Sequence, residues 1–194
     1  VVRGQRRICL QPGDSVLVLG SGLAGLLNMR LARALGAGCI VATDVHPFRL
    51  RAALGSGAQA AIDAGSRKVV EQVLAANEAR GFEHVIVCTA APVAFQQALN
   101  AVSPGGSVLL YAFSAPGSET HFDPHEYFRK SITLCSTYGA SPLDLQQALN
   151  LLRFGRVVVE DFITHRLPLE ETGVGFTLVA SGKESLKVII EPGH

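Results

Sequence analysis

The sequence has no tryptophan, a single methionine and few aromatic residues, and its charges are balanced. Of its 194 residues, 6% are aromatic, and 17 Lys and Arg residues stand against 16 Asp and Glu residues, for a formal net charge of +1. Neither sign is collected into a block, so there is no electrostatic footprint for nucleic acid or an anionic membrane. We therefore expect the partner to be a small molecule.

Long hydrophobic runs are also absent. No apolar run approaches the ~18 residues of a membrane-spanning helix. The N-terminal stretch Val-Val-Arg-Gly-Gln-Arg-Arg lacks the apolar segment and cleavage site of a secretory signal peptide, which favours a cytoplasmic location. The apolar fraction of 48% exceeds what disorder allows, and the length suits one folded domain, or one domain with appendages.

Cysteine and histidine do not gather into a pattern typical of metal sites. The sequence contains no C-x-x-C pair, and three of its cysteines lie in apolar runs, so buried thiols are favoured over disulfides or metal ligands. His121 and His125 are close in sequence, but the Phe-Asp-Pro between them would break a helix and no cysteine is near. We therefore expect no metal site in this chain. The four cysteines are Cys9, Cys39, Cys88 and Cys135.

Short β-branched runs alternate with longer segments of helical period from Gly13 onward, which is typical of βαβ units and a parallel sheet. The run Ser15–Leu19 is continuously apolar after its first residue, which predicts a central strand covered on both faces. The fold predicted is α/β, a doubly wound parallel sheet of the Rossmann type with helices on both faces. Further strands are expected at 39–43, 59–62, 84–88, 107–112, 132–138 and 186–190, helices at 23–35, 47–54, 66–80, 92–102, 141–154 and 170–181, and a long surface connection at 114–128.

A glycine-rich motif follows the first expected strand and opens the first expected helix. Its residues, Gly20-Ser-Gly22-Leu23-Ala24-Gly25, match G-x-G-x-x-G. In this motif the first glycine makes a tight turn, the second lets the backbone approach a pyrophosphate, and the third lets helix and strand pack closely. The free amides of Leu23 and Ala24, with the positive end of the helix dipole, would bind the phosphates. The alternative is a glycine-rich turn of some other α/β fold.

Asp44 stands at the end of the second expected strand, where a dinucleotide fold needs an acid to accept hydrogen bonds from the adenosine ribose. No other acidic residue lies between Asp14 and Asp63. A 2′-phosphate here would meet a like charge, at a cost of roughly 4 kcal/mol near 4 Å, so NAD is favoured over NADP. Arg49 could stack or bond at the adenosine and soften that preference. Alternatively, Asp44 caps the helix that Pro47 opens, and Arg49 is a solvated charge.

Together, several segments resemble the zinc-type medium-chain alcohol dehydrogenases, and most of all the sorbitol and threonine dehydrogenases. The resemblance covers nearly the whole chain and is specific in order and spacing. The segments that carry it are 20–25, 43–45 with Arg49, 104–106, Ile163–Pro168, 181–183 and 187–189.

The resemblance implies a role for individual residues around a bound NAD. Tyr111 departs from the family, which commonly has a small residue at this position, so its ring must turn away from the nicotinamide. No residue of the chain is assigned to catalysis. The cofactor-binding residues implied are Gly20 and Gly25 as glycines of the motif, Gly22, Leu23 and Ala24 at the pyrophosphate with Lys187, Asp44 at the ribose, Arg49 at the adenosine, and main chain near Cys88, Thr89, Leu110, Tyr111, Ala112, Thr137 and Tyr138 at the nicotinamide.

The family resemblance also implies a division of labour. Residues 13–140 would be the coenzyme domain, 1–12 a connection to a zinc-binding catalytic domain that this chain lacks, and 141–194 a part that packs against that domain. The chain would then hold the nicotinamide for oxidation of an alcohol, a polyol or a hydroxy amino acid, and would be inactive alone. The strand at 132–138 is expected at the sheet edge, where a second copy would pair with it to form a homodimer.

Two other hypotheses remain open. The first is a non-catalytic module that senses NADH or joins an assembly, which the lack of catalytic residues supports equally well. The second is a methyltransferase, which also has a glycine loop and an acid after its second strand. It would need a substrate motif after the fourth strand, where the sequence Cys88-Thr-Ala-Ala-Pro92 offers neither an acid nor an amide.

Overall fold

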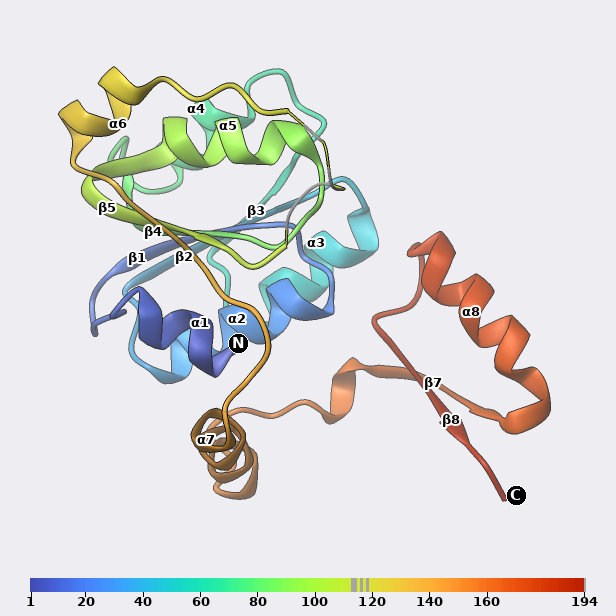
Figure 1. Cartoon of the computed structure of the whole chain (residues 1–194). Helices are drawn as coiled ribbons and strands as arrows, with labels where there is room; N and C mark the ends of the chain where they lie inside the picture. The colour runs from blue at the N-terminus through green and yellow to red at the C-terminus, as the bar shows by residue number, and fades with distance from the viewer. Residues whose placement is uncertain (113–114, 116, 118, 194) are drawn as a thin grey trace.

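A six-stranded parallel sheet forms the centre of the molecule (Figure 1). The computed structural model describes residues 1–112, 115, 117 and 119–193. The strand order is β3-β2-β1-β4-β5-β6, so the chain winds outward in both directions from the middle of the sheet. This order confirms the predicted doubly wound α/β fold. The strands are β1 (Ser15–Leu19), β2 (Cys39–Asp44), β3 (Ala60–Asp63), β4 (Phe82–Val87), β5 (Val102–Leu110) and β6 (Thr133–Ser136).

Helices cover both faces of the sheet. Val16 and Val18 of β1 pack toward α2, whereas Leu17 and Leu19 pack toward α4 and α5, and all five residues of the strand are buried. This two-sided burial is the reason that the strand is apolar from Val16 to Leu19. The helices on the first face are α1 (Val2–Arg7), α2 (Leu23–Ala34) and α3 (Pro47–Gly55), and those on the second are α4 (Val69–Ala75), α5 (Pro92–Ala101) and α6 (Pro124–Lys130).

The C-terminal part forms a separate small sheet beside the large one (Figure 1). After α7 (Pro142–Arg153), a short helix η1 (Glu160–Phe162) leads into β7 (Ile163–Pro168), which pairs in parallel with β8 (Lys187–Glu191). Between them lie η2 (Leu169–Glu171) and α8 (Thr172–Ser181). The sequence predicted α7, α8 and β8. It did not predict β7, in which polar residues interrupt the apolar ones.

Three other expectations were wrong in part. The helix expected at 66–80 begins at Val69, because the Ser66 hydroxyl accepts a hydrogen bond from the Lys68 amide in a local turn, and it ends at Ala75. The strand expected at 107–112 begins earlier and ends earlier, as β5 at Val102–Leu110, and residues 104–106 lie inside it, where its pairing with β4 is irregular. The connection expected at 114–128 falls partly outside the described residues, and its end forms α6, where the Asp123 carboxylate accepts a hydrogen bond from the His125 amide.

The start of α7 is as predicted. The Ser141 side chain accepts a hydrogen bond from the Asp144 amide, and the Asp144 carboxylate accepts one from the Ser141 amide, which makes a capping box. Asp144 also forms an ion pair with Arg6 of α1 at 2.7 Å, which ties the two helices together. In the described part of the chain, no helix combines the length and the apolar character needed to cross a membrane.

Candidate functional site

The carboxyl ends of the central strands meet at one edge of the large sheet. Three backbone hydrogen bonds join the segments that leave these strands: the Gly20 amide donates to Thr43, the Cys88 amide to Leu19, and the Ala112 amide to Val87, at 3.0, 2.7 and 2.9 Å. Because β1 and β4 are neighbours and lead to helices on opposite faces, their carboxyl ends mark the topological switch point at which open α/β sheets bind their ligands. Most of the residues singled out in the sequence lie at this edge.

Each glycine of the motif has a distinct environment. Gly20 has a φ of +95°, and a Cβ there would lie 3.1 Å from the Cys88 carbonyl. A Cβ on Gly25 would lie 2.0 Å from the Gly20 oxygen, so only glycine lets α2 pack this closely on the loop. A Cβ on Gly22 would meet nothing within 4 Å. The free space at Gly22 is where a ligand could approach the backbone.

The N-terminus of α2 has backbone donors that the protein itself does not use. Gly22 is the N-cap residue and has no side chain to cap the helix, and the first turn holds no acidic residue. The amides of Leu23 and Ala24 have no acceptor within the helix, since the first turn of any α-helix leaves its donors free. This end of the helix therefore fits an anionic group such as a phosphate.

Asp44 is buried at the end of β2, with 6% of its surface exposed. Its Oδ2 accepts a hydrogen bond from the Ser21 amide at 2.8 Å, and its Oδ1 accepts one from the His46 amide at 2.9 Å. Because a carboxylate has about four acceptor positions, two more donors can be accommodated. The Ser21 contact was not predicted, since the pattern of the motif does not reveal where a loop amide points.

Arg49 lies beside Asp44. Its Nη1 is 3.8 Å from the Asp44 Oδ2. The guanidinium also lies against the end of α8, because a Cβ on Gly182 would come 2.5 Å from Nη2. Its Nε is buried and has no hydrogen-bond partner among the described residues. The cation partly neutralises Asp44 and retains a free donor.

The segments after β4 and β5 lie next to the glycine loop. The Cys88 thiol accepts a hydrogen bond from the Asn28 side chain at 3.6 Å, and burial raises its pKa to about 12, so the thiol stays protonated. Thr89 packs under Gly20, and the Leu110 carbonyl accepts a hydrogen bond from Thr137. Asn28 is fully buried and was missed, because a polar residue in an expected helix gives no sign of its partner.

The side chain of Tyr111 is half-buried against α1. A Cβ on Gly4 would lie 3.6 Å from the Tyr111 ring, and the ring packs on the cluster that includes Leu109. Burial raises the pKa of the Tyr111 hydroxyl. The ring therefore points toward α1.

Lys187 is the first residue of β8, directly opposite Ile163 of β7. Together with Leu23 at the start of α2 it lines an apolar hollow of about 390 Å³. Lys187 of the small sheet and the first residue of α2 thus face the same hollow.

Within the described residues, no group of three or more His, Cys, Asp or Glu residues could hold a metal ion. The four cysteines are free thiols. Cys9 is exposed, so the expectation of buried thiols is wrong for that residue, which follows α1 in a turn with a φ of +53°.

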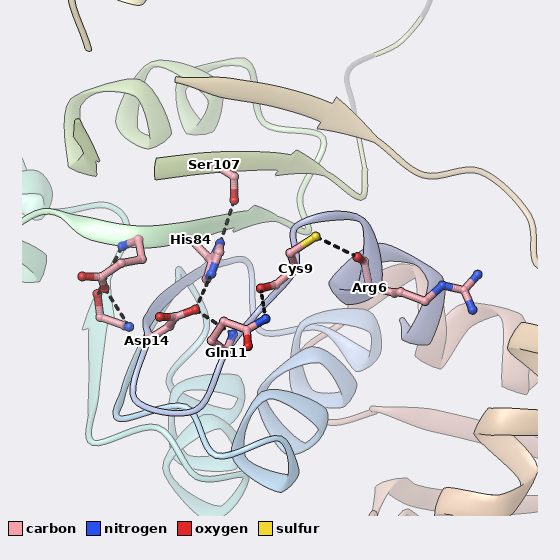
Figure 2. Close-up of polar contacts among 8 residues, drawn as sticks. Arg6, Cys9, Gln11, Asp14, His84 and Ser107 are labelled. Atoms are coloured by element: carbon pink, nitrogen blue, oxygen red, sulfur yellow. Dashed lines mark hydrogen bonds and ion pairs between the residues drawn. The ribbon is translucent and has the colours of Figure 1, made fainter. Parts of the chain in front are cut away.

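A second polar cluster lies at the opposite end of the strands (Figure 2). The His84 imidazole lies between the Ser107 hydroxyl, 2.7 Å from Nδ1, and the Asp14 carboxylate, 2.8 Å from Nε2. The order resembles a nucleophile, a base and an acid. However, Ser107 is 6% exposed within a strand paired on both sides, so we interpret the cluster as structural. His84 was expected at the start of its strand, but β4 begins at Phe82 and His84 is buried.

The comparisons with known proteins agree with this geometry. Residues 24–153 match the model of a family described as zinc-binding dehydrogenase. L-threonine 3-dehydrogenase from Mesorhizobium japonicum is 27% identical over 179 residues, which are 92% of this chain and 51% of that protein. The chain thus spans about half the length of the curated relatives it matches.

Solved structures share the fold. Alcohol dehydrogenase TADH from Thermus sp. ATN1 is 31% identical with a TM-score of 0.88, covering 99% of this chain and 55% of that one. A protein from Sinorhizobium meliloti 1021, solved bound to NADP, is 22% identical with a TM-score of 0.90, covering 98% of this chain and 56% of that one.

Proposed function

Because this chain belongs to the zinc-binding dehydrogenase family, we propose that it is the NAD-binding part of an enzyme that oxidises an alcohol, a polyol or a hydroxy amino acid. The observation that carries the proposal is the pairing of two features at one edge of the sheet. The N-terminus of α2 offers free amides beside the open space at Gly22, and the buried carboxylate of Asp44 lies at the end of the neighbouring strand.

In this proposal, the chain's residues bind and orient the coenzyme. The amides of Leu23 and Ala24 receive the pyrophosphate, and Asp44 accepts hydrogen bonds from the ribose hydroxyls. The main chain at Cys88 and Leu110 forms the floor under the nicotinamide, which when bound supplies the hydride acceptor. The remaining contacts proposed are Gly20, Gly22, Gly25, Arg49, Thr89, Tyr111 and Lys187.

The proposed preference is for NAD over NADP. Asp44 is fixed by two backbone amides, so it cannot swing away from a 2′-phosphate. Arg49, at 3.8 Å, offsets part of the repulsion. The expected result is a preference of moderate size rather than exclusion of NADP. That the relative from Sinorhizobium meliloti was solved with NADP shows why this preference needs a direct measurement.

The zinc and the substrate are proposed to bind residues outside the present chain, which spans 51% of the threonine dehydrogenase it matches. The proposed division is a connecting segment at 1–12, a coenzyme domain at 13–140, and a part at 141–194 that packs against the catalytic domain. The proposed location is the cytoplasm. The present chain by itself is expected to bind coenzyme and to transfer no hydride.

The proposed assembly is a homodimer through β6. Among the described strands, β6 pairs with β5 alone and is an edge of the large sheet. A free edge strand is a template for a second strand, and a two-fold axis would join two sheets into one. Sedimentation at tens of micromolar should give a dimer, and Leu134→Pro should give a monomer. A monomeric wild-type chain contradicts the assembly.

Calorimetric titration tests the proposed function. NADH should bind with one site per chain, NADPH more weakly, and S-adenosylmethionine not at all. Binding of S-adenosylmethionine without NADH would favour the methyltransferase hypothesis. If the full-length protein binds NADH but reduces NAD with none of the proposed substrate classes, the sensor hypothesis replaces the enzyme.

A further inference from the structure

Arg30, on α2, fastens the C-terminal part of the chain to the large sheet. Its Nη1 donates to the Asp161 Oδ1 at 2.6 Å and its Nη2 to the Asp161 Oδ2, which makes a two-pronged ion pair. Nη1 also donates to the Val158 carbonyl. The guanidinium carbon lies 3.8 Å from the centre of the Phe162 ring. One side chain thus holds η1 by charge, by hydrogen bonds and by stacking.

Few other polar contacts between described residues hold this part of the chain, although the Arg49 guanidinium also lies against Gly182. Among the described residues, Arg30 makes the hydrogen bonds and the ion pair that join residues 157–193 to residues 1–89. Phe162 is 2% exposed and packs in the same core cluster as Leu26 of α2. Next to it, the hollow of about 390 Å³ separates α2 from β7 and β8. Val159 and Leu186 pack against the same cluster, so η1 is held by apolar packing together with the polar contacts of Arg30.

Few residues connect the Arg30 contacts to Lys187. Phe162 is followed by Ile163, the first residue of β7, and Ile163 pairs with Lys187 across the small sheet. The position of Lys187 therefore depends on its pairing with Ile163, and Ile163 is covalently bonded to Phe162, whose ring Arg30 contacts. Leu23 lines the same hollow as Lys187.

Arg30 and Leu23 lie on one face of α2. Residues seven apart on a helix share a face and lie about 10 Å apart along the axis. Leu27 and Leu31 complete this face, which lines the hollow opposite Lys187. The start of the helix offers the Leu23 amide, and Arg30, about two turns away, holds η1, which leads into β7, the strand that pairs with the strand of Lys187.

We propose that Arg30 is a positioning residue that acts through Phe162 and Ile163 to hold the Lys187 ammonium over the α2 N-terminus, where it completes the site for the coenzyme pyrophosphate. The inference rests on the proposed function, because it needs a diphosphate at those amides. It assigns to the joint between the two sheets a part in coenzyme affinity, in addition to its part in folding.

A double-mutant cycle with NADH titrated into the full chain tests this inference. Lys187→Met should raise the dissociation constant about tenfold, the loss of one charged contact to phosphate. Arg30→Met should raise it by a similar factor in the wild-type background and less than about twofold in the Lys187→Met background. Arg33→Met is the matched control. It removes an exposed arginine three residues along α2 that does not contact η1, and it should leave the affinity unchanged.

Several outcomes overturn the inference. If Arg30→Met weakens binding by the same factor in both backgrounds, Arg30 stabilises the fold only. If Lys187→Met leaves the affinity unchanged, Lys187 has no phosphate to hold. Should Arg30→Met fail to fold, Asp161→Asn takes its place in the cycle with the same expectation. A wild-type chain that binds no NADH instead overturns the proposed function, so the two failures are distinguishable.

Discussion

The carboxylate of Asp44 accepts a hydrogen bond from the backbone amide of Ser21 at 2.8 Å, and so joins the end of β2 to the glycine loop. An acid at this position is usually considered for what it offers to a ribose. Here it also fixes the conformation of the loop that would receive the phosphates. Its removal should therefore affect two halves of a bound dinucleotide together.

The first prediction separates these two roles of Asp44. Asp44→Asn keeps one carbonyl oxygen for the Ser21 amide but loses the charge, so NADH affinity should fall modestly and the preference over NADPH should shrink. Asp44→Ala leaves both the Ser21 and the His46 amides without their acceptor, so stability should also fall, by about 1–3 kcal/mol. Titration with both coenzymes and chemical denaturation measure the two effects. Equal stability of the two variants would contradict the bracing role.

The second prediction compares two glycines of the motif. Gly25→Ala places a Cβ 2.0 Å from the Gly20 oxygen, so the loop and helix must move apart, at a cost of about 1–3 kcal/mol. Gly22→Ala meets nothing within 4 Å and should cost less than about 1 kcal/mol. NADH binding should nevertheless be lost in both. In Gly25→Ala the displaced loop no longer fits the pyrophosphate, and in Gly22→Ala the new methyl group occupies the space where the pyrophosphate approaches. A stable Gly22→Ala variant that binds NADH normally would show that the ligand lies elsewhere.

The parts of the fold that sequence could predict are those with local causes. The central strand is apolar because both of its faces are covered, and α7 begins at a Ser-Pro-Leu-Asp capping box. The glycines and Asp44 could be placed because the βαβ pattern puts the ends of neighbouring strands together. These features need only a few adjacent residues to be recognised.

What could not be predicted depends on partners far apart in sequence. β7 exists because β8, more than twenty residues later, pairs with it. An ion pair joins Arg30 to Asp161, and His84 joins Asp14 to Ser107. In each case the residue type is compatible with many surface positions, and only the folded chain selects the partner.

The third prediction concerns how the stability contributed by the Arg30–Asp161 ion pair depends on pH. The hydrogen bonds from Arg30 lower the pKa of Asp161, so the folded state holds this carboxylate in its charged form more strongly than the unfolded state does. The stabilisation is present above the ordinary aspartate pKa of about 4 and is lost as the pH falls through the lowered folded-state value. Asp161→Asn should therefore lose less stability than the wild type between neutral pH and strongly acidic pH.

Denaturation midpoints at a series of pH values below 7 provide the measurement. The matched control is Glu184→Gln, which removes an exposed carboxylate of the small sheet region and should follow the wild-type pH profile. Because Asp161 is partly exposed, the difference should be small and should shrink in high salt. If Asp161→Asn follows the wild-type profile as well, the ion pair makes no contribution in solution.

The last prediction separates the two ends of the sheet. His84 connects Asp14 and Ser107 at the amino end of the strands (Figure 2), whereas the glycine loop follows their carboxyl end. His84→Leu leaves the buried Ser107 hydroxyl without this partner and weakens the turn that Asp14 also braces through the Gln11 amide, so stability should fall by about 1–3 kcal/mol. Ser107→Ala should cost less, and the double variant should cost less than the sum, because both remove one interaction. NADH affinity should stay at the wild-type value in every variant that folds, because the substituted residues lie at the end of the sheet opposite the glycine loop. A His84→Leu chain that is as stable as the wild type would show that the cluster does not stabilise the fold. One that folds but binds NADH several-fold more weakly would show that the cluster also affects the coenzyme site.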